Sequence, residues 1–314
     1  MTREWGYAAG ITSALLFGIS TTFNKIVLGT LHPMAVTALI YLTGGLVLIV
    51  FRGLFSPLET AVRSKTRNHV KERFTGRDYV ILALVILSGV VLAPYLFLSG
   101  LKATTAVNTS LLGNMEPLFT ALIAYLLLRE RGSRRDYIAM TVILLGSVAL
   151  TTNLDFAELR LTERLTGNLL VVGGTFFWGI DNNLSRLLSV RGNLVKIASW
   201  KGLFGGLTVL ALTIYLGIPL NVTLSIVPYL LVVGVLSIGV SILLFLFALQ
   251  QIGAMRTGVI FSISSLFGAA FAFIVLSEPF SPIQAFAGLA MMFGVFLLVS
   301  EPTEAKKDLR KPPS

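Results

Sequence analysis

A single acidic residue in the middle of a long apolar segment is the group in this chain best placed to do chemistry. The segment runs from Thr104 to Arg129 and is long enough to cross a bilayer, since about 20 helical residues span the hydrocarbon. Glu116 lies 12 residues after Thr104, too deep for its carboxyl to reach interfacial water. A charge at the bilayer centre costs about 2.5–3.5 kcal/mol. We therefore expect this carboxyl to face an internal cavity, where it can take up and release a proton.

Polar residues that can share a helix face with the acid form a stripe. At about 100° per residue, Thr105, Thr109 and Thr120 fall on the same side of the helix as Glu116. Asn108 is a further candidate for contact with a substrate or coupling ion in the same segment. The stripe predicts a binding or ion-coupling site. The alternative interpretation is a protonated Glu116 that only ties two helices together.

A proline, Pro117, directly follows the acid. Because proline has no N–H, it would leave the carbonyl of Gly113 without its helical partner and would kink the helix. We therefore expect a hinge beside Glu116.

A second polar group lies in the segments that we predict to be the sixth and seventh helices. Asp181 is followed by Asn182 and Asn183, and Lys201 comes 20 residues after Asp181. Three interpretations of the two charges stay open: they pair with each other across adjacent helices, they extend to interfacial water, or they contact a substrate. At least one of the asparagines is expected to face a cavity.

Three further residues are candidates for the same pathway. Tyr95 and Trp178 are aromatic candidates, although most aromatic residues in such a chain pack between helices or lie in interfacial belts. Ser264 occupies the position that corresponds to Glu116 in the second half of the chain, 148 residues later.

The composition is that of a membrane protein with several spans. Hydrophobic residues make up 55% of the 314 residues and charged residues 13%, whereas soluble domains carry about 25% charged residues. There is no cysteine, which excludes disulfides and thiol catalysis, and the only two histidines, His32 and His69, disfavour a metal site. We predict no cofactor. Charge-free runs predict ten helices, at residues 5–28, 33–52, 78–101, 104–129, 135–152, 167–188, 194–216, 226–250, 256–276 and 280–299.

The net charge of +10 is explained by membrane orientation rather than by nucleic-acid binding. With the N-terminus inside, the inner segments hold 20 Lys and Arg residues and the outer loops only three, Lys102, Arg160 and Arg164. This bias predicts a multi-pass protein of the cytoplasmic membrane with both termini in the cytoplasm.

The chain repeats itself at fixed offsets. Phe17-Gly18 matches Trp178-Gly179 after 161 residues, and Glu130 matches Glu278 after 148. Because each half has five spans, an odd number, the halves must insert in opposite directions. The predicted organisation is a first five-helix repeat at 1–152, an external loop at 153–166, a second repeat at 167–300 and a cytoplasmic tail at 301–314.

The two halves together resemble the EamA-type branch of the drug/metabolite transporter superfamily. This resemblance implies a ten-helix exporter of small metabolites that works by alternating access around a central cavity. It covers residues 5 to 300, and the residues that carry it are Pro94-Tyr95 through Leu101, the run SLLGNMEPLFTALIAYLLLRE (Ser110–Glu130), the weaker copy SISSLFGAAFAFIVLSEPFS (Ser262–Ser281), and the spacings Glu130…Gly146 and Glu278…Gly294.

The leading hypothesis is a secondary-active transporter, with amino-acid-like compounds as the first substrate class and protons as a possible partner. No nucleotide-binding motif follows a predicted strand, so a gradient must supply the driving force. The alternatives are a channel or lipid scramblase and, less favoured, a membrane-embedded enzyme. An enzyme would need a catalytic cluster at one membrane face, and the two histidines are far apart in the sequence.

Overall fold

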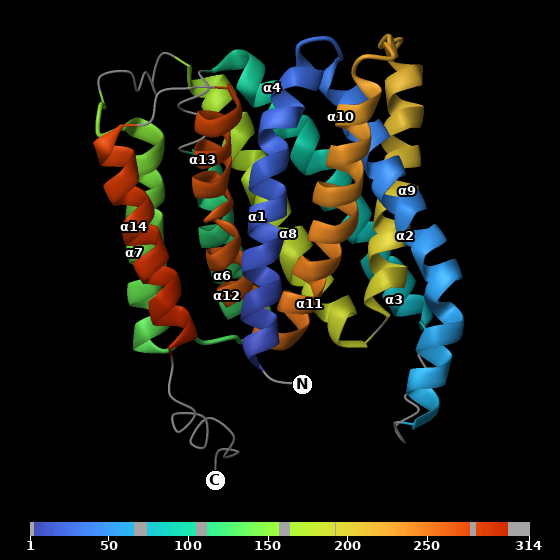
Figure 1. Cartoon of the computed structure of the whole chain (residues 1–314), viewed down its shortest axis with the longest axis horizontal. Helices are drawn as coiled ribbons and strands as arrows, with labels where there is room; N and C mark the ends of the chain where they lie inside the picture. The colour runs from blue at the N-terminus through green and yellow to red at the C-terminus, as the bar shows by residue number, and fades with distance from the viewer. Residues whose placement is uncertain are drawn as a thin grey trace.

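The computed structural model describes residues 3–65, 74–104, 112–156, 164–191, 193–276 and 281–300, and every element in them is a helix. The helices run side by side as one bundle, and α1 begins at the same end of the bundle at which α14 finishes (Figure 1). The pair α7 and α14 forms one edge of the bundle, and α2 and α9 lie together toward the other (Figure 1). Helices α1, α6, α8, α12 and α13 fill the middle (Figure 1).

The elements of the two halves follow the same order. Those of the first half are α1 (Arg3–Leu28), α2 (Pro33–Lys65), α3 (Gly76–Ile86), the π-helix η1 (Leu87–Leu92), α4 (Ala93–Ala103), α6 (Met115–Leu127) and α7 (Arg134–Thr152). Those of the second half are α8 (Leu165–Arg191), α9 (Leu194–Tyr215), α10 (Val227–Val232), the π-helix η2 (Val233–Ser241), α11 (Ile242–Ile252), α12 (Ala254–Phe261), α13 (Ser264–Leu276) and α14 (Pro282–Val299).

Seven helical segments among the described residues are long and apolar enough to cross a membrane. Two further helices, α1 and α8, have 26 and 27 residues but are more polar, and α6 is a shorter apolar helix. The polar residues of α8 are largely buried inside the bundle, so its low hydropathy reflects an internal polar face. The prediction of an all-helical multi-pass membrane protein is confirmed.

One predicted helix is much longer in the structure, and two are interrupted. Helix α2 continues to Lys65, although we expected it to end at residue 52. The end of an apolar run marks where a helix leaves the hydrocarbon, and a helix can continue into water beyond that point. The predicted spans 104–129 and 256–276 are each interrupted: Asn114 forms a turn before α6, and Ser262 and Ile263 form a turn between α12 and α13.

Two Gly-Gly pairs, Gly44-Gly45 and Gly205-Gly206, let the main helices approach closely. A Cβ added at Gly45 on α2 would lie 2.4 Å from the backbone nitrogen of Leu203 on α9. A Cβ added at Gly206 on α9 would lie 2.7 Å from the backbone nitrogen of Leu42 on α2. The α2–α9 contact is therefore a backbone-to-backbone contact that only glycine permits.

We expect Gly45→Ala to destabilise the bundle, because the added methyl group would force α2 away from α9. Overpacking of this kind costs about 1–3 kcal/mol. Gly76 at the start of α3 is the matched control, since nothing lies within 4 Å of a Cβ added there. Thermal unfolding in detergent should give a lower midpoint for Gly45→Ala and an unchanged one for Gly76→Ala. Equal midpoints would show that α2 and α9 separate at no cost.

Candidate functional site

The acid of the first half meets an asparagine of the second half inside the bundle. Asn182 Nδ2 on α8 donates to Glu116 Oε1 on α6 at 2.9 Å and lies 3.0 Å from Thr120 Oγ1. Asn182 is 5% exposed and Thr120 fully buried. Glu116 and Thr120 are one helical turn apart on α6, and both contact the same asparagine of α8.

The backbone around Glu116 is the start of a helix rather than a kink within one. Asn114 forms the turn, and Glu116 and Pro117 occupy the first turn of α6. A carboxylate is favoured there by the helix dipole, and proline is tolerated there because its missing N–H would have no helical partner. We expected a proline kink in a continuous helix. The structure instead has a break at Asn114, three residues before Pro117.

Asn183, beside Asn182, adds a buried polar group that the described residues only partly satisfy. Its Nδ2 donates to the carbonyl oxygen of Thr120 at 3.0 Å and to that of Gly179 at 2.8 Å. Its Oδ1 is buried and accepts no hydrogen bond from any residue of the described ranges. A buried acceptor left unpaired costs about 1–3 kcal/mol. A buried acceptor of this kind is available to contact water or a ligand.

The two charged residues of α8 and α9 form an ion pair inside the bundle. Lys201 Nζ lies 2.5 Å from Asp181 Oδ2, and Ser185 Oγ donates to Asp181 Oδ1 at 3.1 Å. The two side chains are only 8% and 6% exposed, which excludes the interpretation that they extend to interfacial water. Each charge stabilises the other inside the bundle. Removing one partner of a buried pair lowers the free energy of unfolding by about 3–5 kcal/mol. Both lie within electrostatic range of Glu116.

The π-helical turn η1 packs directly against this ion pair. A Cβ added at Gly89 would lie 2.2 Å from Asp181 Oδ2, so only glycine lets the carboxylate approach. Trp178 Nε1 on α8 donates to the carbonyl oxygen of Gly89 at 3.2 Å, which places this predicted residue at the edge of the site. π-Helical turns are frequent at functional sites.

Two residues of the site were not predicted from the sequence. Gly89 lies in an apolar run where it looks like any packing glycine, and Tyr41 on α2 looks like any buried aromatic residue. The structure places Tyr41, which is 9% exposed, within electrostatic range of Asp181 and Glu116. Neither residue carries a local signal, because each belongs to the site only through a helix from elsewhere in the chain.

The structure does not bring every candidate to this cluster. Tyr95 lines a separate cavity of about 390 Å³ between α2, η1, α4 and α9, whose wall is mostly apolar. The backbone of Ser264 at the start of α13 lies against Gly18 of α1. Thr105, Asn108 and Thr109 lie outside the described residues. No group of three His, Cys, Asp or Glu residues that could hold a metal ion occurs in the part of the chain that the structure describes.

Comparisons with known proteins point to one family. Residues 4–152 and 165–300 each match the model of the EamA-like transporter family. A protein of Methanothermobacter thermautotrophicus described as an uncharacterized transporter is 42% identical over 304 residues, covering 95% of this chain and 87% of that protein. The uncharacterized transporter YyaM of Bacillus subtilis is 22% identical over 69% of this chain and 71% of its own length.

A solved crystal structure has the same fold. It is 18% identical, covers 98% of this chain and 99% of its own, and superposes with a TM-score of 0.77. The family model matches both halves and leaves only the connecting segment and the chain ends outside. The chain therefore belongs to the EamA-like transporter family.

Proposed function

We propose that this membrane transporter is a secondary-active exporter that works by alternating access, with small amino-acid-like metabolites as the leading substrate class. The observation that carries the proposal is the buried cluster in which Asn182 joins Glu116 and Lys201 joins Asp181. A zwitterion offers one ammonium and one carboxylate, and the Asp181–Lys201 pair offers the complementary two charges. The substrate can replace each partner of the pair without leaving a buried charge unpaired.

Protons are the proposed coupling ion, with Glu116 as the group that carries them. A carboxyl inside the bilayer gains or loses a proton as its hydration changes between the two states of a cavity. A gradient then drives the substrate if proton and substrate prefer different states. Asn182 supports this role, because its side chain donates to Glu116 and can accept from the protonated acid after a flip of its amide.

The proposed architecture is ten spans arranged as two inverted repeats, at 1–152 and 167–300, with the loop 153–166 between them and the tail 301–314 after them. Four features support it by recurring after 148 residues. The helix breaks occur at Asn114 and Ser262, the α7 and α14 capping boxes begin at Ser133 and Ser281, and Gly146 and Gly294 occupy equivalent positions in the α7–α14 contact. The π-helices η1 and η2 overlap at the same offset. Interrupted helices at matching positions of two halves are typical of transporter binding sites.

The proposed orientation in the cytoplasmic membrane has both termini inside. Because the chain has no cysteine, an introduced one is the only target for a thiol reagent. A cysteine at the exposed Arg131 should be labelled by an impermeant maleimide only in inside-out vesicles, and one at the exposed Thr223 only in intact cells. Labelling of position 131 in intact cells would overturn the orientation.

We expect Glu116→Gln to fold normally and to keep substrate counterflow, but to lose uptake driven by a pH gradient. The amide keeps the volume and can still bond Asn182, whereas it cannot carry a proton. The measurement is saturable counterflow and pH-driven uptake in proteoliposomes, screened first over amino acids. Glu4→Gln, an acid exposed at the start of α1, is the matched control and should behave as wild type.

Each outcome of this assay separates the candidate functions. Counterflow without pH-driven uptake in Glu116→Gln supports coupling at this acid, and wild-type uptake would make Glu116 a packing residue. Flux that neither saturates nor shows counterflow would favour the alternative of a channel or lipid scramblase.

A further inference from the structure

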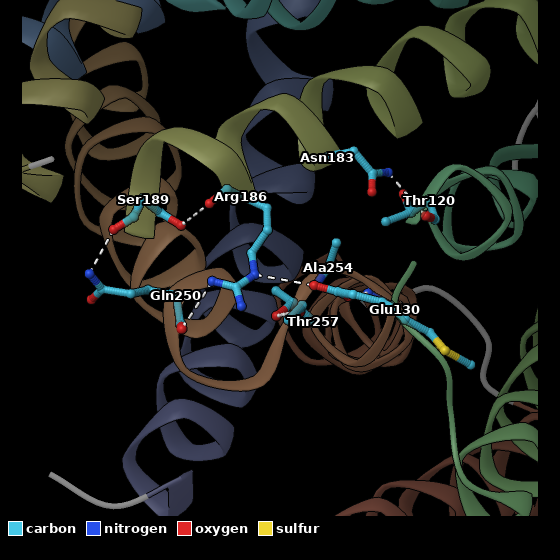
Figure 2. A network of polar contacts seen from close by, with 10 residues as sticks. Thr120, Glu130, Asn183, Arg186, Ser189, Gln250, Ala254 and Thr257 are labelled. Atoms are coloured by element: carbon cyan, nitrogen blue, oxygen red, sulfur yellow. Dashed lines mark hydrogen bonds and ion pairs between the residues drawn. The ribbon is translucent and has the colours of Figure 1, made fainter. Parts of the chain in front are cut away.

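Glu130, in the segment after α6, joins three elements at the end of the bundle where α1 begins and α14 finishes (Figure 1). Its Oε2 accepts hydrogen bonds from the backbone N–H groups of Ala254 at 2.9 Å and Met255 at 3.4 Å, the first residues of α12. Its Oε1 accepts from Arg186 Nε of α8 at 3.3 Å. Figure 2 shows the Glu130 side chain lying between the start of α12 and Arg186. One carboxylate thus caps a helix of the other half and pairs with a second helix of that half.

Arg186 extends the contact to the end of α11. Its Nη1 donates to the carbonyl oxygen of Gln250 at 3.1 Å, and Gln250 Nε2 donates to the carbonyl oxygen of Ser189 at 2.6 Å (Figure 2). The ends of α8 and α11 are therefore joined twice, one turn apart on α8. Glu130, Arg186 and Gln250, together with the first N–H groups of α12, form what we call the latch.

The turn between α11 and α12 is shaped to fit the carboxylate. Gly253 has φ of +86°, a conformation that residues with a side chain rarely adopt. A Cβ added there would lie 2.8 Å from Glu130 Oε2. Glycine is needed at this position both for its backbone conformation and for its lack of a side chain. The resulting turn brings the first N–H groups of α12 against Glu130.

The latch lies at the ends of α8 and α12, two helices that also contact Thr120 of the candidate site. One turn deeper, Asn183 of α8 donates to the carbonyl oxygen of Thr120 on α6, and Gly258 of α12 packs against the Thr120 side chain. Thr120 is in turn bonded to Asn182, the partner of Glu116. A solute that leaves the site between α6, α8 and α12 toward this end would therefore meet the latch.

The latch is more accessible to water than the neighbouring ion pair between α7 and α12. The side chains of Arg186 and Glu130 are 22% and 24% exposed, so water can replace their contact. Asp136 and Arg256 form two hydrogen bonds, at 2.6 and 2.7 Å, with side chains only 3% and 13% exposed. The buried pair is suited to anchor α12 permanently to α7, and the exposed pair to break and reform.

We infer that the latch acts as a gate, in which Glu130, Arg186 and the N-terminus of α12 close this end of the path from Glu116. The end opens when Glu130 releases both Arg186 and the N–H groups of α12. Release frees α12 from α8 while the Asp136–Arg256 pair still holds α12 to α7. This inference rests on the proposed alternating access and adds the residues that control access at one end.

The test measures how fast a water-soluble maleimide labels a single cysteine behind the gate, in protein held in lipid nanodiscs. Thr257→Cys is the reporter, because Thr257 is fully buried one turn beyond Ala254 and its hydroxyl donates to the carbonyl oxygen of Gly253, just before the same helix (Figure 2). Adding Arg186→Gln should raise the labelling rate at least about tenfold. Adding Glu130→Gln, which keeps an acceptor for α12, should raise it less. The reporter that carries Arg186→Lys instead should be labelled as slowly as the reporter alone, because lysine keeps the positive charge at this position.

Two controls separate a gate from a general loosening of the bundle. Arg256→Gln breaks the other ion pair of α12 and should leave the labelling rate of the Thr257→Cys reporter within about twofold. A second reporter, Thr37→Cys at the opposite end near the start of α2, should not be labelled faster in any gate variant. An equal rise with Arg256→Gln, or a rise at both reporters, would overturn the gate.

The labelling assay does not depend on transport. Faster labelling in Arg186→Gln together with no saturable flux in proteoliposomes would keep the gate and reject the proposed transport function. Unchanged labelling in a protein that shows counterflow would reject the gate alone.

Discussion

Polar groups buried inside a lipid-embedded bundle must find their partners within the protein, and this constraint organises the whole structure. Water is not available in the hydrocarbon to satisfy a carboxylate, an ammonium or an amide. Glu116, Asp181 and Lys201 are therefore placed on the inner faces of α6, α8 and α9, where Asn182 and Ser185 complete their hydrogen bonds. The helices α6 and α8 accordingly lie in the middle of the bundle, and α9 lies toward the side opposite the α7–α14 pair (Figure 1).

The close approach that such partners need is made possible by missing side chains. Gly89 lets η1 touch the Asp181 carboxylate, and Gly45 lets α2 touch α9, the helix that carries Lys201. Asn183 Oδ1, a buried acceptor with no hydrogen-bond partner among the described residues, lies in this same region. A buried acceptor beside a tightly packed ion pair is available to bind a polar group.

Two ion pairs at the end of the bundle where α1 begins differ in how deeply they are buried. Asp136 and Arg256 are well buried and doubly bonded, so breaking them is costly. Glu130 and Arg186 keep partial contact with water, and Glu130 also holds the backbone of α12. A protein that changes conformation needs both kinds, because some contacts must persist while others exchange.

The class of the protein and the positions of its polar residues follow from local patterns along the chain. Long apolar runs require helices in lipid, since no other single segment satisfies its own backbone there. The uncompensated acid at Glu116, the polar run from Asp181 and the Gly-Gly pairs could all be recognised locally, and so could the 148-residue repeat. Which of these residues meet depends on how the helices pack against one another. Asn182 is 66 residues from Glu116 along the chain, and the periodicity of α8 alone does not say which helix its polar face touches.

The same reason explains the errors of the sequence analysis. The Asp181–Lys201 pair stayed one of three options, because a charge near a predicted helix end can reach water unless a neighbour covers it. The breaks at Asn114 and Ser262 are hidden in apolar runs that read as continuous helices. Glu130 directly follows the predicted helix at 104–129, but its bonds to Ala254 and Arg186 join segments 124 and 56 residues away. Contacts between distant helices depend on packing, which no local pattern encodes.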